Sequence, residues 1–458
     1  MAVALPLILG LATYVGIHFL EPRLAITWSY AHLHRYTLLP WLGIGLLATL
    51  PILVSFAWQW PAGERPVTRW PTGRIVAAFV LLWLALWALG TAFPAPTFSI
   101  DVVYFTNAVK SGTGQNARWY LLLWFFEGLA NLVRPALSWL GVIRGTNAAF
   151  SAVALLALAG AARRLGQSRR EAAAITLLAW SAFGILQLVM GYTDIYPFPL
   201  AVTAVYCWLA LGVIAGEVHP LWPSLVAVLA PFWYVGLVLL APSLLVVVVE
   251  AGRGAHGSLR LAVAAVVALA AAGLATVPGF GRPFAWGAFL ARAAADSEAE
   301  LGLSPTSSLL PPDFMLSTRH AGEVAHTVLL VDGIGWLLLL VPGAALLLHS
   351  AGRTRDGKAA CLGLLVVPYF AYVIAMDPIF GSYADWDLFS YGAVVTSLLG
   401  GYAFVSWGRR CPRAFAPLLG LALAAAGVHL LARLNALDVG MQQHLLESPY
   451  HLVAPSAG

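Results

Sequence analysis

A series of long apolar runs constrains the fold of this chain more than any other feature. About a dozen runs approach the roughly 20 residues that a helix needs to cross a hydrocarbon core about 30 Å thick. Inside lipid, each backbone N–H and C=O must be satisfied within its own segment, so helices are the expected form. The runs are Leu5–Leu20, Leu38–Trp58, Ile75–Phe93, Ala148–Leu165, Ala172–Met190, Pro197–Ala215, Leu221–Val249, Leu261–Val277, Val328–Leu348, Ala359–Ala375, Phe389–Trp407 and Ala414–Leu434. The sequence predicts an all-α, polytopic membrane protein with about 12–13 transmembrane helices.

The composition agrees with a membrane protein and excludes an ordinary soluble domain. Hydrophobic residues make up 60% of the 458 residues and charged residues only 10%, whereas a soluble domain has about a quarter charged residues. The three cysteines have no metal-type spacing, and the chain contains no tandem repeat or low-complexity tract. The first run lacks a basic segment and a cleavage signal, so we interpret it as a retained span. We expect one multi-pass domain over 1–458.

The distribution of arginine predicts the orientation of the chain. We place the N-terminus inside and treat Leu221–Val249 as a close pair of short helices broken at Pro231. Most of the 25 Lys and Arg residues then fall in inner loops, including the arginine clusters of 163–170 and 409–413, as the positive-inside rule requires. The net charge of +5 therefore reflects orientation in the membrane, and we expect no nucleic-acid partner.

The same topology puts most of the carboxylates outside. Because only basic residues count in the orientation rule, this acidic bias is separate information. The expected outer loops are 94–144, 191–196, 281–326 and 377–388, followed by a short outer tail, 435–458. The chemistry of the protein is expected on this outer face.

The first outer loop contains the aromatic segment WYLLLWFFEGLANLVRPALSWLG, in which Glu127, Asn131 and Arg134 recur at helical spacing. Such a segment suits a helix that lies in the membrane interface with its apolar side down. The alternative is a thirteenth span with a charged face, which its central charges disfavour.

The start of that loop, FSIDVVYFTNAVKSG, contains the first candidate pair. Asp101 follows the third apolar run by about one helical turn, and Tyr104 comes three residues later, so the two side chains would share a helix face. The alternative is structural, because an aspartate at a helix start caps exposed N–H groups.

The second candidate loop is GYTDIYPFPL, which contains Tyr192 and Asp194. Asp194 is an acidic candidate in a tight outer turn. Two structural explanations compete with function. Asp194 with Pro197 can simply begin a helix with a cap and a first-turn proline, and tyrosines are common where a span meets the membrane interface.

The third candidate group lies in PPDFMLSTRHAGEVAHTVLLVDG, at the entrance of the ninth run. His320 and Glu323 are one turn apart and could orient a general base or join a metal site, while Arg319 could clamp a phosphate. His326 follows on the same segment. The alternative is that these are ordinary residues of a helix entrance.

The fourth candidate group lies in DPIFGSYADWDLFSYG. Asp385 and Asp387 stand two residues apart, so in extended backbone their side chains point the same way and Trp386 points oppositely. Their mutual repulsion requires a cation, hydrogen-bond donors or a proton. Magnesium or manganese prefers such oxygen ligands, and a phosphate-bearing substrate would complete the coordination. The alternative is that Asp387 caps the eleventh helix and Asp385 is solvated.

With these loops the sequence resembles the GT-C superfamily of membrane glycosyltransferases, which includes protein O-mannosyltransferases, oligosaccharyltransferases and lipid A aminoarabinose transferases. SIDVVYFTNAV and the aromatic segment after it look like the first outer loop of that group, and GYTDIYPFPL like its second acidic loop. FMLSTRHAGEV and FGSYADWDLFS resemble later outer loops.

The resemblance implies transfer of a sugar from a polyprenyl-phosphate donor to a glycan, lipid or protein acceptor on the outer face of a prokaryotic cytoplasmic membrane. Asp101 would be the base and Asp194 would assist it or help bind a metal. The substrate-binding candidates are Tyr104, Tyr192, Arg319, His320, Glu323 and Trp386, and the metal candidates are Asp385 and Asp387.

Three other functions stay open at this point. A transporter or flippase for lipid-linked sugars would have charged residues near the bilayer midplane and discontinuous helices, and the proline-rich run Leu221–Val249 is compatible with that. A polysaccharide polymerase or ligase would differ mainly in its acceptor. A noncatalytic relative could retain the fold.

Overall fold

The described part of the chain is helical throughout. The computed structural model describes residues 3–17, 72–92, 120–133, 137–189, 195–253, 317–345, 356–375 and 389–435, and these ranges contain helices and no strand. The elements are α1 (Ala4–Ile17), α4 (Thr72–Ala92), α6 (Tyr120–Val133), α7 (Trp139–Leu165), α8 (Arg169–Trp180), α9 (Phe183–Val189), α10 (Pro197–Ile214), α11 (Leu221–Trp233), the 3₁₀ helix η3 (Val235–Ser243), α12 (Leu244–Arg253), α16 (Thr318–Leu338), the π-helix η5 (Leu339–Gly343), α18 (Gly357–Ala375), α20 (Ala393–Gly408) and α21 (Pro412–Asn435). The expected all-α class is confirmed.

Several of these helices are built to cross a membrane. Four of the described helices, α4, α7, α10 and α18, are long and apolar enough to span, and the bent pair within α16 and η5 would make a fifth. Other helices have shorter apolar stretches, such as Ala4–Thr13 in α1, Ala393–Gly408 in α20 and Pro412–Val428 in α21. The predicted runs Leu38–Trp58 and Leu261–Val277 lie outside the described residues. The polytopic membrane character is therefore confirmed on the part of the chain that the structure describes.

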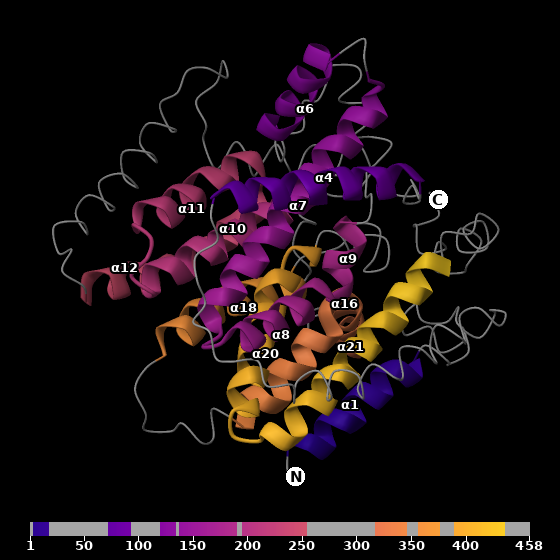
Figure 1. Cartoon of the computed structure of the whole chain (residues 1–458), viewed down its shortest axis with the longest axis vertical. Coiled ribbons are helices and arrows are strands. Elements are labelled where there is room, and N and C mark those ends of the chain that lie inside the picture. Colours follow the sequence, from indigo (N-terminus) through magenta and orange to yellow (C-terminus); the bar gives the residue numbers. More distant parts are fainter. Residues whose placement is uncertain are drawn as a thin grey trace.

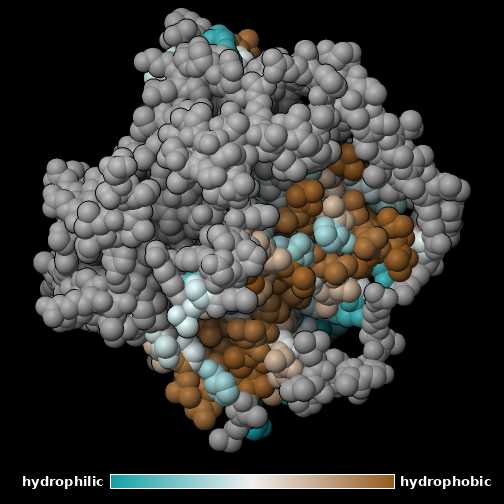
Figure 2. Space-filling model, turned by 180° about the vertical axis from the view of Figure 1, so that it is seen from behind, coloured by the Kyte–Doolittle hydropathy of each residue, from teal (hydrophilic) through white to brown (hydrophobic). Residues whose placement is uncertain are grey.

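The surface carries the apolar side chains that a lipid-facing protein needs. Leu81 and Leu245 are each 69% exposed and Val367 is 66% exposed, and Figure 2 shows broad hydrophobic areas on the face turned away in Figure 1. In water such contiguous areas would be a liability. Around these helices, lipid tails cover them.

The centre of the bundle is formed by α7, α10 and α20. Helix α7 packs along α10, and α20 packs against α8 and α16, while α4 crosses α7 and α1 lies beside α21 (Figure 1). Small residues let these helices approach closely. A Cβ on Gly160 of α7 would lie 2.7 Å from the indole of Trp208 on α10, so only glycine leaves room for that ring.

Local sequence explains where several helices begin and end. Ser138, Ser168 and Ser317 each accept a hydrogen bond from the backbone N–H three residues later, at the starts of α7, α8 and α16. Side-chain caps of this kind satisfy donors that a helix start leaves open. Helix α10 begins with Pro197 and ends before Gly216, whose φ of 71° is the left-handed conformation that glycine adopts at low cost.

The break expected within Leu221–Val249 is present. Pro231 lies in the last turn of α11, and Tyr234 after it is extended, with φ −153° and ψ 115°. The chain continues as η3 and α12. The two apolar halves therefore form the expected close pair, with the break three residues beyond the proline.

The aromatic segment before the fourth span divides differently from the prediction. Helix α6 ends at Val133 and α7 already begins at Trp139, so the span predicted over Ala148–Leu165 starts nine residues earlier. Ser138 caps α7 and Leu137 precedes it, which is why the helix starts there. The 14 residues of α6 that the structure describes extend over about 21 Å.

Two predicted spans are interrupted. The run Ala172–Met190 is divided into α8 and α9 at Ser181 and Ala182. The ninth run is broken at Asp332, where φ is −158° and ψ is 54° within α16. The parts His320–Leu329 and Val331–Gly343 meet at an angle of 86°. We call His320–Leu329 the first arm of α16. The second arm, Val331–Gly343, comprises the rest of α16 and η5.

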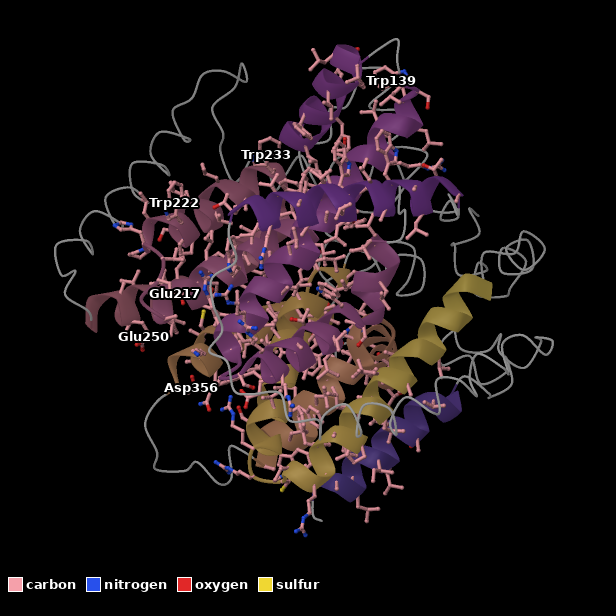
Figure 3. The ribbon with its side chains drawn as sticks, in the orientation of Figure 1. Trp139, Glu217, Trp222, Trp233, Glu250 and Asp356 are labelled. Carbon is pink, nitrogen blue, oxygen red and sulfur yellow. The ribbon has the colours of Figure 1, made fainter. Side chains whose placement is uncertain are left out.

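One end of the bundle gathers charged side chains, and we call it the charged end. Arg164 at the end of α7 donates to Glu217 after α10 at 3.0 Å, and Lys358 at the start of α18 donates to the carbonyl of Arg164 at 2.5 Å. Figure 3 shows Glu217, Glu250 and Asp356 close together on this side, away from Trp139 and Trp233.

The two arginine clusters expected on one side do meet at the charged end. Arg409 after α20 forms two hydrogen bonds with the Glu171 carboxylate at the start of α8, at 2.7 and 2.8 Å. Because this pair joins 163–170 to 409–413, both clusters lie on the same side of the bundle.

The Glu171–Arg409 pair yields a pH prediction. Burial raises the pKa of Glu171, but hydrogen bonds from Arg409 and the Gln167 N–H outweigh it, so the pKa lies below its ordinary value of 4.5. A lowered carboxyl pKa stabilises the fold above the unfolded pKa and loses that effect as the pH falls through the folded pKa. We expect Glu171→Gln to reduce stability by about 1 kcal/mol near pH 7 and to match the parent well below pH 4.5.

Thermal unfolding of purified protein at several pH values measures this difference. Arg410→Gln removes a neighbouring exposed charge and is the control, which should change stability by less than about 0.5 kcal/mol. A Glu171→Gln effect that stays constant down to acidic pH would contradict the ion-pair explanation.

Candidate functional site

The end of the bundle opposite the charged end is rich in aromatic side chains, and we call it the aromatic end. Helix α18 starts at the charged end beside Lys358, and α20 ends there beside Arg409. The end of α18 and the start of α20 therefore lie at the aromatic end, where α10 and α16 also begin. The loops that the sequence singled out join these termini. The aromatic end is therefore the candidate functional site.

Aromatic rings tie the first outer segment to this end. Phe125 of α6 lies with its ring centroid 6.0 Å from that of Trp233 at the end of α11. Trp233 in turn lies 5.7 Å from Phe198 in the first turn of α10, and Phe198 lies 5.2 Å from Phe150 of α7. Helix α6, which follows the loop with Asp101, is thus packed at the aromatic end.

A second group of buried rings at this end, the tyrosine cluster, consists of Tyr196, Tyr234, Tyr369 and Tyr391. The ring of Tyr234 lies 6.1 Å from Tyr196 before α10 and 5.9 Å from Tyr391 before α20. Tyr391 lies 6.1 Å from Tyr369 of α18. Ring pairs at this spacing stabilise by about 1 kcal/mol beyond the buried area, so the helix termini are held in a fixed arrangement.

A small hollow adjoins the tyrosine cluster. Tyr369 and Tyr391 line it with Gly236 and Thr203, and the Tyr391 hydroxyl donates to the Gly236 carbonyl at 3.5 Å. The Tyr369 hydroxyl donates to the carbonyl of Phe389. The hollow therefore has polar groups on a mostly apolar wall.

His320 is the one predicted site residue whose side chain the structure describes. It lies in the first turn of α16, where its N–H donates to the Ser317 hydroxyl at 3.1 Å, and it is 3% exposed. Its Nε2 lies 2.7 Å from the carbonyl oxygen of Ile374. Because a carbonyl only accepts, Nε2 carries a proton. The imidazole is thus fixed between the start of α16 and the end of α18.

Asp332 is a buried carboxylate that the sequence analysis did not select. It is 2% exposed and accepts hydrogen bonds from the Gly335 N–H at 3.0 Å, the Ser397 hydroxyl at 3.1 Å and the Thr396 hydroxyl. A Cβ on Gly335 would overlap the carboxylate. The signal in the sequence was VDGIG, a carboxylate within an apolar run followed by two glycines, since an ionisable residue inside a span is a site candidate by default.

The other predicted site residues are not located. Seven of them lie outside the described residues: Asp101, Tyr104, Tyr192, Asp194, Asp385, Trp386 and Asp387. Of Arg319 and Glu323 only the position in α16 is described. What is described is the arrangement of the neighbouring helix termini.

Two structural alternatives can be compared with the caps that are described. The N-cap position of α10 is Tyr196 and that of α20 is Gly392. Asp194 and Asp387 themselves lie outside the described residues, so their capping alternatives stay expectations from the sequence. The first-turn proline of α10, Pro197, is present as expected.

The two residues predicted to bind a metal, Asp385 and Asp387, lie outside the described ranges. Among the residues that the structure describes, no three His, Cys, Asp or Glu side chains are grouped so as to hold a metal ion. Cys207 and Cys361 are buried free thiols and Cys411 is half-buried. The pair Asp385 and Asp387 stays an expectation from the sequence.

Comparison with known proteins returns structural neighbours and no sequence relatives. No family model and no curated protein matches the chain. Among solved structures, the chain is similar to ArnT from Cupriavidus metallidurans bound to undecaprenyl phosphate, with 15% identity and a TM-score of 0.48 over 80% of this chain and 77% of that one.

A second solved structure is similar at a comparable level. It is the apo oligosaccharyltransferase of Archaeoglobus fulgidus, with 13% identity and a TM-score of 0.44 over 78% of this chain and 55% of that one. Neither structure assigns a site residue, a donor or an acceptor to this chain.

Proposed function

We propose that this protein is a membrane glycosyltransferase that moves a sugar from a polyprenyl-phosphate donor to an acceptor at the aromatic end. The observation that supports it is the meeting of helix termini there. Ring contacts and the His320–Ile374 hydrogen bond hold together the termini of α6, α10, α16, α18 and α20. These termini flank the loops that contain the acidic and basic residues selected from the sequence.

Sugar transfer requires a base for the acceptor and a group that neutralises the departing phosphate, and the loops contain candidates for both. A lipid phosphate is a good leaving group, so the main requirements are an activated acceptor oxygen aligned behind the anomeric carbon and neutralisation of the departing phosphate. We assign the base to Asp101, assisted by Asp194. We assign the phosphate to Arg319 and His320.

The remaining candidates would shape the substrate site. Tyr104, Tyr192, Glu323 and Trp386 are assigned to substrate binding, because aromatic rings and carboxylates contact sugar faces and hydroxyls. A magnesium or manganese ion held by Asp385 and Asp387 would neutralise phosphate charge. The exposed apolar helix surfaces provide the environment for the polyprenyl tail, with membrane lipid as the surrounding partner.

The orientation follows from the charged end. We place that end, with its two arginine clusters, in the cytoplasm and the aromatic end outside the cytoplasmic membrane of a prokaryote. The N-terminus lies beside the start of α21, which follows Arg409 (Figure 1), and so would be cytoplasmic.

The test is a transfer assay with the full-length protein. Purified protein in lipid nanodiscs is incubated with polyprenyl-phosphate sugars and with glycan, lipid and protein acceptors, and the products are identified by mass. We expect one acceptor class to gain one sugar mass while free polyprenyl phosphate is released. Donors that remain intact with every acceptor class would contradict the proposal.

The metal assignment has its own prediction. If Asp385 and Asp387 hold a divalent ion, the double variant Asp385→Ala, Asp387→Ala should lose about tenfold or more in turnover and should no longer respond to added magnesium or manganese. Turnover of the parent should fall with EDTA and return with the ion. An identical response to chelator in parent and variant would exclude these two residues as metal ligands.

A transporter for lipid-linked sugars is the second candidate, and Asp332 is the observation that favours it. A buried carboxylate at an 86° break within a span is what discontinuous helices of transporters provide. Against it, three donors from α16 and α20 already satisfy this carboxylate. Proteoliposomes distinguish the two functions, because a flippase moves an intact labelled donor between leaflets without any acceptor.

A further inference from the structure

The first arm of α16 is held at two points. At its start, the His320 imidazole donates to the Ile374 carbonyl of α18 at 2.7 Å. Just beyond its end, Asp332 binds the hydroxyls of Thr396 and Ser397 on α20. Arg319 directly precedes this arm in α16 and Glu323 lies on it, so these two attachments govern where the substrate-binding candidates of α16 lie.

The attachment at Asp332 coincides with the bend of α16. Its carboxylate accepts from the Gly335 N–H three residues later, which is the N-cap arrangement for the helical turn that follows Asp332 in the second arm. Its own backbone is non-helical, so the hydrogen bonding of a continuous helix is interrupted there. The carboxylate satisfies the Gly335 N–H and, through the hydroxyls of Thr396 and Ser397, holds the second arm against α20.

The geometry points to Asp332 as a positioning residue. We propose that its carboxylate, through Thr396 and Ser397, sets the direction of the first arm and so places His320 for the donor phosphate. The inference rests on the proposed function for its consequence in catalysis, but the positioning itself is a property of the fold. Removal of the carboxylate lets the two arms straighten or rotate, and the anion-binding end of the arm moves away from α18.

The first test measures the arm directly. Spin labels on Ala325→Cys in the first arm and Ala371→Cys in α18, both exposed positions, report their separation by pulsed electron resonance. The three native cysteines are replaced by alanine, and the full-length protein is kept in nanodiscs. We expect Asp332→Ala to shift or broaden the distance distribution, and Asp332→Asn, which keeps a capping oxygen, to leave it close to the parent.

A matched control lies at the charged end. Asp356 also caps a helix, accepting from the Lys358 N–H at 2.9 Å, and also binds a hydroxyl of α20, that of Tyr402 at 2.6 Å. Asp356→Ala should leave the Ala325–Ala371 distance unchanged. Thr396→Val, which removes a donor to Asp332 and leaves α16 intact, is the second variant in case Asp332→Ala fails to fold, and it should shift the distance in the same direction.

The second test is kinetic. In the transfer assay, Asp332→Ala should raise the KM for the polyprenyl-phosphate donor about tenfold, with kcat and the acceptor KM changed less than about twofold. Asp332→Asn should restore most of the donor KM. A general loss of structure would instead lower kcat for both substrates.

The outcomes separate the two proposals. If the distance is unchanged in both Asp332→Ala and Thr396→Val, the positioning inference is overturned whatever the activity. If the distance shifts but the parent transfers no sugar, the positioning role stands and the proposed function fails. A shift together with a selective rise in donor KM supports both.

Discussion

Asp101→Asn is expected to abolish sugar transfer while the protein still inserts, folds and binds its donor. An amide keeps the size of the carboxylate but cannot accept the proton of the acceptor hydroxyl. General-base catalysis contributes about a hundredfold to ten-thousandfold, so turnover should fall by at least about a hundredfold. Initial rates at saturating donor and acceptor measure the loss, and thermal unfolding of the same sample checks the fold.

Two further variants make this result specific. Asp194→Asn should cost less, about tenfold, because Asp194 is assigned only a supporting role. Asp356→Asn, at the charged end of α18, should turn over at the parental rate. Normal turnover in Asp101→Asn would remove Asp101 as the base, and an equal loss in Asp356→Asn would attribute the effect to the fold.

The helical membrane fold was predictable because apolar length and charge asymmetry act on the whole chain. The break near Pro231 followed from proline chemistry together with the need to place both arginine clusters on one side, and the Arg409–Glu171 pair confirms that placement. Boundaries were harder to predict. Trp139 starts α7 because Ser138 caps it, a local effect that the aromatic segment concealed.

The candidate site was predictable only in part. Acidic and basic residues in outer loops can be recognised one loop at a time, and His320 was selected in this way. Asp332 was missed because its meaning depends on Thr396 and Ser397, more than sixty residues away. The carboxylate in VDGIG can cap a broken helix only when another helix supplies hydroxyls. The residues of the run itself do not indicate which helix will pack there.

The contact between α16 and α20 yields the second large prediction, because it supports the break at Asp332. Gly400 of α20 faces Gly335, and an added Cβ would overlap the Gly335 carbonyl oxygen and lie 3.3 Å from the Leu338 Cβ. Backbone atoms cannot move aside as the end of a side chain can. Gly400→Ala should therefore destabilise the protein by about 1–3 kcal/mol, although alanine has the better helix propensity.

Gly401→Ala is the matched control for this contact. The added Cβ would lie 3.4 Å from the Ile175 Cγ2, an ordinary van der Waals distance, and the gain in helix propensity is the same. We expect Gly401→Ala to unfold at the parental temperature or slightly above it, and Gly400→Ala several degrees below it. Equal unfolding temperatures would mean that α16 and α20 do not approach so closely, and the attachment of Asp332 to α20 would lose its structural basis.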